Sequence, residues 1–481
     1  MQKPRLGASV ACALALSLVR GAVAQEAPRI ESYRLDLGPA QIAQAQATTT
    51  RAIASQAYLI GLPAFMNLAQ LASYRAARLT TAPQEEPFGG RLLVRDFSTP
   101  DTTTVMPNVD TLYGAAFLRL DLQGPVVLSL PALRDRYLSV AILDAYFSDV
   151  AVLGPHTVGG IAANILIAPP GWDQATPEGI DQVVVVPTPV ATLFQRVRAR
   201  DEADLAAARS VQDAIRLAPL NRWRGPDRSF PHIETSAYDG EALHHLRDPL
   251  RFFEVVADYT ALNPPPPPYR ALSAMSNAVG LGPGGQLPET PALREVSAAG
   301  ARDAQLAIDA VASYGPFRKG WRVPDPQTGR LGLDPLRHAA TQVTQVGSLP
   351  TDEAMYFVAV RDAQDRPLDG RRRYTLTFPA GQLPPVGPGG FWSLTMYRAS
   401  DGRLVENPIG RYLVGPETPG LAPASDGSLT VTFAAERPAG VPEGNWLPAP
   451  RDAFLVTLRT YLPQIAIRDG TWFPPAVQRV D

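Results

Sequence analysis

The string PNVDTLY at residues 107–113 offers an amide, a carboxylate and a phenol within one short segment: Asn108, Asp110 and Tyr113. Side chains of these types, lining a pocket, suit hydroxylated ligands or acid–base work. Proline, asparagine and aspartate also close turns by bonding to their own backbone. The string therefore has two interpretations, a pocket wall and a structural turn.

A second polar cluster lies further along, at Arg134, Asp135, Arg136, Asp144 and Tyr146. Asp144 is a further candidate for acid–base catalysis, and Arg136 is a candidate ligand contact. The alternative is a set of ion pairs at the ends of strands.

The C-terminal part combines aromatic residues with arginines and amides, and its candidate ligand-binding residues are Asn407, Arg411, Trp446 and Arg459. Aromatic platforms beside amides and arginine suit sugars or carboxylated ligands, although tryptophans also simply fill cores. Because an unpaired buried charge is costly, we expect Asp110 to pair with Arg411 or Arg459. Asn108, Asp110 and Tyr113 would then share one pocket with the C-terminal half.

Several chemistries are excluded. The 44 basic and 46 acidic residues leave no basic footprint for nucleic acid. The chain lacks the Gly-x-Ser-x-Gly and His-Glu-x-x-His motifs. Its single cysteine is Cys12, and its five histidines lack ligand spacing. The sequence predicts neither a metal nor a cofactor.

The first 24 residues have the pattern of a signal peptide. Lys3 and Arg5 precede an apolar run over residues 6–19, and Ala22-Val23-Ala24 offers a cleavage site. No run reaches the roughly 20 apolar residues that span a bilayer. We therefore expect a soluble periplasmic or secreted protein that begins at Gln25 and has no integral membrane segment.

The hydrophobic patterns predict a mainly β protein with helices. Residues 50–80 have a helical period, and residues 115–120 and 125–130 read as a hairpin. The pattern divides the chain after the signal peptide into three parts: an N-terminal helix plus β-sandwich (25–200), a helical region (201–346) and a second β-sandwich (347–481). Both sandwiches are expected to be antiparallel and jelly-roll-like.

The two β regions contain a faint internal repeat. Residues 127–131 and 136–145 are echoed by residues 374–379 and 390–399. Pro187 and Pro189 precede Arg196 much as Pro448 and Pro450 precede Arg459. The sequence indicates either two related sandwiches or a chance likeness.

These strings resemble a known pair of domains. PNVDTLYGAAFLRL, GPVVLSLP and RYLSVAILDAY are similar to the domain of unknown function numbered 1254; LDGRRRYTLTF, NPIGRY and NWLPAPRDAFLVTLR are similar to the one numbered 1214, its usual C-terminal companion in exported proteins. The resemblance implies jelly-roll-type sandwiches with a helical part, and no agreed activity, cofactor or catalytic residues. The matching motif positions are Asn108, Asp110, Tyr113, Arg136, Asp144, Asn407, Arg411, Trp446 and Arg459. Members often have a histidine before the PNxDTLY string, where this chain has residues 88–91, FGGR.

Three functions follow as hypotheses. The first is a cofactor-free hydrolase, lyase or hydratase, with Asp110 or Asp144 as acid–base, Tyr113 as proton donor and an arginine as carboxylate clamp. The second is a non-catalytic periplasmic binding protein for a small molecule. The third is a structural protein that assembles, since jelly rolls associate readily, and this leaves a homo-oligomer open.

Overall fold

The computed structural model describes residues 36–76, 91–231, 233, 248–249, 251–313, 315–330, 332 and 334–480. The predicted signal peptide and residues 77–90, which include most of FGGR, lie outside this part. The chain divides into two compact units, Met1–Thr48 and Thr49–Asp481. The description below concerns the second unit, which contains all of the sheets.

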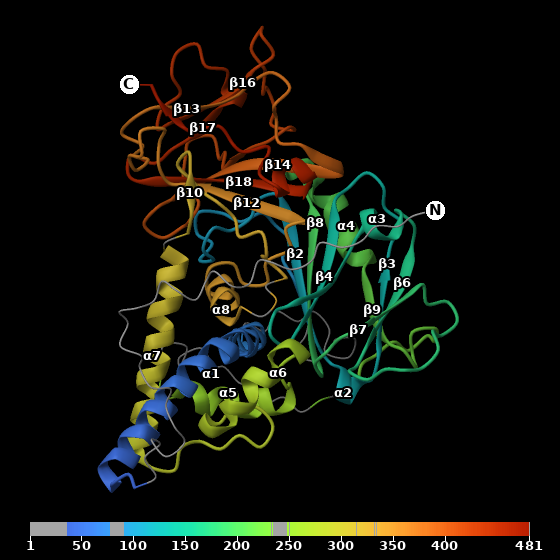
Figure 1. Ribbon diagram of the computed structural model, residues 1–481. Helices are drawn as coiled ribbons and strands as arrows, with labels where there is room; N and C mark the ends of the chain where they lie inside the picture. Colours follow the sequence, from blue (N-terminus) through green and yellow to red (C-terminus); the bar gives the residue numbers. More distant parts are fainter. Residues whose placement is uncertain are drawn as a thin grey trace, which may run out of the picture. The chain divides into compact units, whose positions relative to one another are not determined.

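Two sheets form the N-terminal β region (Figure 1). The first sheet has the order β1 (Arg91–Leu93), β2 (Thr111–Arg119), β8 (Val190–Arg198), β4 (Leu138–Asp144), β5 (Asp149–Leu153). The second has the order β7 (Gln182–Val185), β6 (Ala163–Ala168), β3 (Val126–Leu130), β9 (Arg216–Pro219). Leu112 and Val140 of the first sheet share one core with Leu128 and Ile165 of the second.

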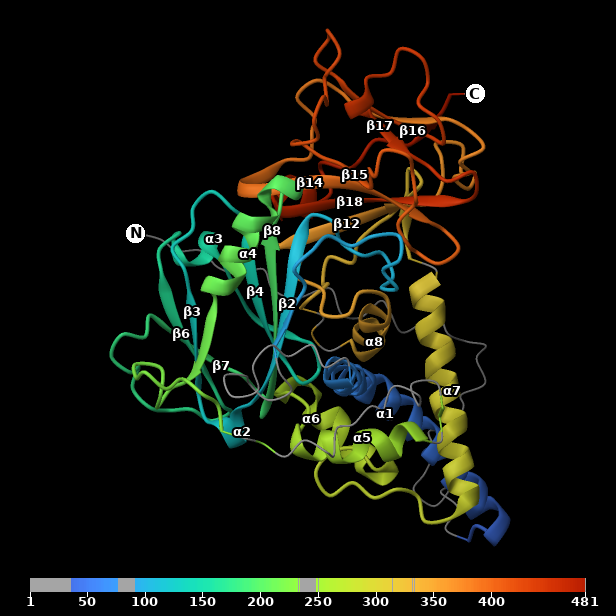
Figure 2. The same ribbon diagram turned by 180° about the vertical axis from the view of Figure 1, so that it is seen from behind.

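Two further sheets form the C-terminal β region. One has the order β10 (Phe317–Arg318), β11 (Trp321–Arg322), β12 (Ala354–Ala359), β18 (Phe454–Pro463), β14 (Val386–Arg398), β15 (Leu413–Val414). The other has the order β17 (Trp446–Pro448), β16 (Leu429–Ala434), β13 (Tyr374–Phe378), β19 (Gln478–Arg479). Their core includes Phe357, Leu394, Leu376 and Val431. In both ribbon views, β12, β14 and β18 lie across one end of β2, β4 and β8 (Figures 1 and 2).

The two β regions have the same strand order. The series β1-β2-β8-β4-β5 corresponds to β11-β12-β18-β14-β15, and β7-β6-β3-β9 corresponds to β17-β16-β13-β19. The repeated sequence segments fall on β3 and β4 in the first region and on β13 and β14 in the second. The faint sequence repeat thus coincides with a repeated topology.

Two details of the predicted strand arrangement are wrong. β2 and β3 do not form a hairpin, because they belong to different sheets. The short helix α2 (Leu120–Gln123) and Gly124, with φ of 72°, carry the chain from one sheet to the other. The sheets are also not wholly antiparallel: β6 pairs with β7, and β16 with β17, in parallel. The connections 169–181 and 435–445 are long enough for the crossover that a parallel pair needs.

Helices form a third region with its own core. Its main members are α1 (Pro39–Ala76), α5 (Arg251–Leu262), α6 (Pro267–Ser273), α7 (Pro291–Ser313) and α8 (Pro335–Thr344). Phe65 of α1, Phe252 of α5 and Ile308 of α7 are buried together. The 3-10 turn Ala274–Val279 continues from α6 and adds Val279 to this core. Other short helices lie elsewhere: α3 (Pro155–Val158), α4 (Leu205–Ala214), α9 (Ile465–Arg468) and the 3-10 turns Glu202–Asp204 and Glu443–Asn445.

One helical stretch among the described residues, Pro39–Ser73, is long and apolar enough to cross a membrane. Of its most apolar window, 72% is buried inside the protein. The apolar residues of this helix therefore serve a protein core, as Phe65 shows.

Candidate functional site

Each β region presents the same three residue types in one row across its sheet. Tyr113 of β2 and Ser139 of β4 are the strand partners of Arg196 on β8. In the C-terminal region Tyr356 of β12 and Ser393 of β14 are the partners of Arg459 on β18. Direct partners on neighbouring strands point to the same face, so each face presents a tyrosine–arginine–serine row.

Hydrogen bonds between buried groups join the two regions at these rows. Ser393 Oγ donates to Asp110 Oδ2 over 2.7 Å, and Tyr137 OH donates to Glu353 Oε1 over 2.5 Å. Asp110 and Glu353 each precede their row's tyrosine by three residues. In each region, therefore, a carboxylate accepts a hydrogen bond from a hydroxyl group of the other region.

Asn108 closes the predicted turn and also contacts the other half of the protein. Its Oδ1 accepts hydrogen bonds from the backbone N–H of Asp110 at 2.6 Å and of Thr111 at 3.3 Å, which closes the turn before β2. Its Nδ2 donates to Tyr461 OH at 2.6 Å, across to the C-terminal region. The turn thus fixes a side chain that contacts the other half.

The expected ion pair of Asp110 with an arginine is not formed. No arginine in the described part of the chain lies within 4.0 Å of the Asp110 carboxylate. Arg459 instead donates to neutral oxygens: Thr395 Oγ1 at 2.9 Å, Tyr397 OH at 2.7 Å and Met106 O at 3.1 Å. Burial raises the pKa of Asp110, and the nearby charge of Arg459 opposes that rise.

Three tyrosines meet beside the two arginines. The Asn108 amide lies 3.5 Å from Tyr113 OH, and the hydroxyls of Tyr356 and Tyr461 lie 3.4 Å apart. Burial raises the pKa of Tyr356 and Tyr461. Burial also acts to raise the pKa of Tyr113, but the charge and hydrogen bonding of Arg196, the charge of Arg459 and the Asn108 amide together outweigh it and lower this pKa below its ordinary value. Tyr113 is therefore the phenol of the three that ionises most easily.

Arg196 is a buried cation with unused donors. Its side chain has 5% of its surface exposed, and its guanidinium carbon lies 5.1 Å from the centre of the Tyr113 ring. Nη2 donates to the carbonyl of Gly347 at 3.1 Å. Nε and Nη1 are buried and form no well-aligned hydrogen bond with the described residues, although the guanidinium is close enough to the Tyr113 phenol to interact with it. A guanidinium in this state can donate to an anion that enters the site.

The Glu353 carboxylate links this cluster to a more exposed histidine. Its Oε2 lies 2.8 Å from Nε2 of His156, which is 23% exposed, while its Oε1 accepts the bond from Tyr137. Tyr137 in turn packs against Tyr461, with ring centres 5.0 Å apart. Polar contacts therefore extend from a half-buried imidazole to Tyr137, whose ring packs against the tyrosine cluster.

Asp144 lies apart from this cluster. It is five residues along β4 from Ser139, a separation of roughly 16 Å at the usual strand rise. Its Oδ1 accepts from the backbone N–H groups of Tyr146 at 2.8 Å and Ser148 at 3.0 Å. These bonds close the turn between β4 and β5.

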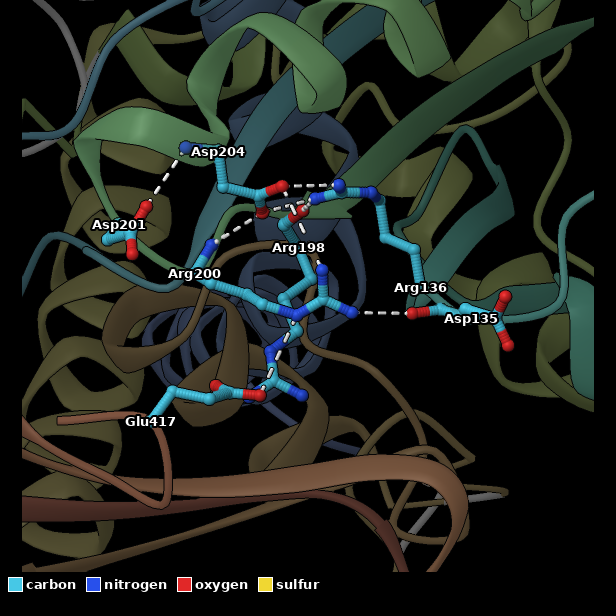
Figure 3. A network of polar contacts seen from close by, with 7 residues as sticks. All are labelled: Asp135, Arg136, Arg198, Arg200, Asp201, Asp204 and Glu417. Atoms are coloured by element: carbon cyan, nitrogen blue, oxygen red, sulfur yellow. Dashed lines mark hydrogen bonds and ion pairs between the residues drawn. The ribbon is translucent and has the colours of Figure 1, made fainter. Parts of the chain in front are cut away.

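Arg136 belongs to a separate ion-pair network (Figure 3). Its guanidinium binds the Asp204 carboxylate at 2.6 Å and the carbonyl of Arg198 at 2.5 Å. Arg198 also pairs with Glu417 of the C-terminal region. The predicted alternative for this cluster, ion pairs near strand ends, describes Arg136 well.

The remaining three predicted residues make local contacts in the C-terminal region. Asn407 bonds the carbonyls of Val405 and Arg411, both at 2.9 Å. Arg411 donates to the backbone oxygens of Glu443 and Trp446, and Trp446 Nε1 donates to Ala434 O at 2.8 Å. The structure thus brings Asn108, Asp110, Tyr113 and Arg459 together, and places Arg136, Asp144, Asn407, Arg411 and Trp446 elsewhere.

The sequence-based candidates did not include Arg196, Tyr356, Tyr461 or Ser393. The internal repeat contained the missing signal, because it already aligned Arg196 with the candidate Arg459. Extended to the preceding strands, it would have aligned Tyr113 with Tyr356.

A small cavity of about 20 Å³ lies on the other face of β8. Gln195, Leu193, Leu128 and Val140 line it, so it lies between the two N-terminal sheets. It is not part of the tyrosine–arginine cluster. Within the described residues, no group of three or more His, Cys, Asp or Glu side chains could hold a metal ion.

Comparison with known proteins identifies both β regions. Residues 91–219 match the family model described as a protein of unknown function, DUF1254, and residues 353–465 match the one described as DUF1214. The chain therefore belongs to the proteins in which these two domains occur in this order. No curated protein matches the sequence significantly.

The comparison with solved structures found two matching crystal structures. The VPA0106 protein from Vibrio parahaemolyticus is 20% identical, with a TM-score of 0.68 over 90% of this chain and 100% of that chain. An uncharacterized protein from Burkholderia cenocepacia is 14% identical, with a TM-score of 0.44 over 91% of this chain and 95% of that chain. The first likeness shows that the whole arrangement of sheets and helices recurs in another protein.

Proposed function

We propose that the cluster around Arg196 and Tyr113 binds a small carboxylated molecule and exchanges a proton with it. The protein would then be a cofactor-free enzyme of the hydrolase, lyase or hydratase type. The observation that supports this most directly is the pair of unused, buried donors on Arg196. Leaving a buried polar group unsatisfied costs about 1–3 kcal/mol, and more for a charged group. A bound carboxylate removes this cost.

The neighbouring groups suit the two roles. Arg196 neutralises and orients the anion. Tyr113, with its lowered pKa, accepts a proton in its phenolate form and returns it as a phenol. Asn108 holds an amide against the same phenol. Asp110 accepts from Ser393, and Arg459 donates to Met106 O, so both bonds hold the C-terminal half in place around the site.

The finer architecture and the location belong to the same proposal. We take each β region to be a sandwich of jelly-roll type, since the paired sheets share a core. We take the protein to be exported, because of the pattern of its first 24 residues. Intact mass of material from the periplasm or medium should correspond to a chain that begins at Gln25.

Binding of simple carboxylates tests the proposed site. Acetate, propionate and phenylacetate, and the corresponding neutral amides, are titrated calorimetrically into the wild type, Arg196→Gln and the control Arg95→Gln. Arg95 pairs with Asp213 at the surface. At least one acid should bind the wild type and Arg95→Gln, bind Arg196→Gln at least tenfold more weakly, and be preferred over its amide. If no acid binds the wild type, or if Arg196→Gln binds as tightly as the control, the proposal is wrong.

Tyr113→Phe separates catalysis from binding. In an enzyme, this variant should bind the acid that the wild type binds but lose turnover of the substrate found by screening related acids. If the wild type binds acids and turns over none, the protein is a non-catalytic binding protein.

A further inference from the structure

The residue row beside the tyrosine–arginine–serine row differs between the two β regions. In the N-terminal region Gln195 precedes Arg196 on β8, and its strand partners are Gly114 and Val140. The equivalent row of the C-terminal region consists of three apolar core residues: Phe357, Leu458 and Leu394. A glycine thus takes the place of a phenylalanine, and a glutamine the place of a leucine. The N-terminal row therefore contains less apolar volume and one polar amide.

The cavity of about 20 Å³ between the two N-terminal sheets lies at this row, because Gly114, Val140 and Gln195 all line it. Apart from Arg91, the other side chains that line it are apolar: Ala115, Ala116, Leu128, Leu193, Ile215 and Leu217. Arg91 and Leu217 are half-buried and the remaining lining residues are buried. The cavity is therefore nearest to solvent at Arg91 and Leu217.

Gln195 brings an unused hydrogen bond donor to this cavity. Only 5% of the residue's surface is exposed, and its Nε2 has no hydrogen bond partner among the described residues. Its Oε1 accepts from Arg91 Nη2 at 3.4 Å, which fixes the orientation of the amide. A Cβ at Gly114 would lie 2.3 Å from Nε2, so only a glycine leaves room for this amide. A ligand that accepts a hydrogen bond from Nε2 removes the cost of burying this donor without a partner.

The wall of the cavity defines the chemistry of that ligand. Gln195 Oε1 is already bonded to Arg91, and the remaining lining side chains offer no acceptor. A buried water makes about three hydrogen bonds, which these side chains do not supply. A charged group is costly to bury against apolar side chains. The wall thus favours a neutral molecule that accepts one hydrogen bond and donates none.

We infer that this cavity binds a small neutral molecule, or the end of one, with a single hydrogen bond acceptor and no donor, such as a short ketone or nitrile. Its acceptor atom bonds Gln195 Nε2, and its apolar part packs against Leu193 and Ile215. Adjacent residues of a strand point to opposite faces, so this site lies behind the one at Arg196. The inference is independent of the proposed function.

Matched pairs of probes test the inference: acetone with isobutene, and acetonitrile with propyne. The two members of a pair have nearly the same shape, and only the first has an acceptor atom. Each probe is titrated into protein labelled at the methyl groups of isoleucine, leucine and valine. In the wild type, acetone or acetonitrile should produce saturable shifts of the methyl signals of Val140, Leu193 and Ile215.

Gln195→Met keeps most of the shape of the glutamine and lacks the donor. It should bind the acceptor probe about fivefold or more weakly than the wild type does, and it should bind the hydrocarbon of the same pair at least as tightly. Gln195→Leu introduces the residue type of the C-terminal row, and it replaces Gln195→Met if the methionine variant does not fold.

Gln123→Leu is the matched control. Gln123 is a second buried glutamine whose Nε2 has no partner among the described residues, and it does not line the cavity. This variant should bind the probes as the wild type does. If neither acceptor probe shifts the three methyl signals, or if Gln195→Met binds the acceptor probe as tightly as Gln123→Leu does, the inference is wrong. Neither result bears on the carboxylate site, which the titrations of Arg196→Gln test separately.

Discussion

Arg196 and Arg459 occupy equivalent positions in the two halves of the protein, each opposite a tyrosine on one side and a serine on the other. Their surroundings differ. Arg459 donates to Thr395, Tyr397 and Met106, whereas two nitrogens of Arg196 form no well-aligned hydrogen bond with the described residues. Arg459 is thus bonded twice within its own region and once to the other half, whereas Arg196 makes one hydrogen bond to the described residues.

Replacing each arginine by methionine should give opposite results. Arg196→Met removes an unsatisfied buried charge and should leave the free energy of unfolding unchanged or raise it. Arg459→Met removes three hydrogen bonds and leaves their acceptors buried, which should cost about 2–4 kcal/mol. Denaturant unfolding of both variants and the wild type measures the difference. Equal losses in the two variants would mean that Arg196 is as fully bonded as Arg459.

Tyr113 should be visible as a phenol that ionises early. Its pKa lies below the ordinary value because the charge and hydrogen bonding of Arg196, with the charge of Arg459 and the Asn108 amide, outweigh burial. An ultraviolet titration of the folded protein should therefore contain one phenol that ionises before the others. That signal should be absent in Tyr113→Phe and should move to higher pH in Arg196→Met. An unchanged titration curve in Tyr113→Phe would contradict the assignment.

Asp144 should affect stability through its proton. Burial raises its pKa to about 6, from 3.8 in an unperturbed group. Between about pH 4 and 6 the folded protein holds a proton that the unfolded chain has released. The free energy of unfolding therefore falls as pH rises through this window, by at most about 3 kcal/mol. Asp144→Asn keeps the Oδ1 acceptor of both backbone bonds and should not show this fall.

The quantity to compare is the difference in the free energy of unfolding between the wild type and Asp144→Asn at each pH. His338, whose pKa burial lowers to about 4, acts in the opposite direction over the same window and is present in both. If the wild type and Asp144→Asn have parallel pH profiles, the proposed pKa of Asp144 is wrong.

Tyr137→Phe tests the contact between the halves that mirrors Asp110 and Ser393. The variant removes a 2.5 Å hydrogen bond to the buried Glu353 carboxylate and should lower the free energy of unfolding by about 1–3 kcal/mol. Tyr412→Phe is a matched control, because no hydrogen bond of its hydroxyl occurs in the described structure, and it should change stability by less than about 0.5 kcal/mol. Equal effects of the two substitutions would show that the Tyr137–Glu353 bond does not stabilise the fold.

Local features were predictable from the sequence, and contacts between distant segments were not. The turn at Asn108 follows from side chain-to-backbone bonding within four residues. Its other bond reaches Tyr461, 353 residues away, and no local pattern encodes such a partner. The same limit explains the wrong hairpin. Two apolar runs with a short connection look alike whether they pair or enter facing sheets, since both arrangements bury the same side chains.

The repeated strand order means that one chain contains two covalently joined β regions of the same topology. In a symmetric homodimer, any mutation appears in both subunits. Two residues at equivalent positions are then always the same residue in the same surroundings, so they cannot differ in their contacts. A tandem chain is free of that constraint. Each copy can change alone, so residues at equivalent positions can acquire different contacts, as Arg459 and Arg196 have.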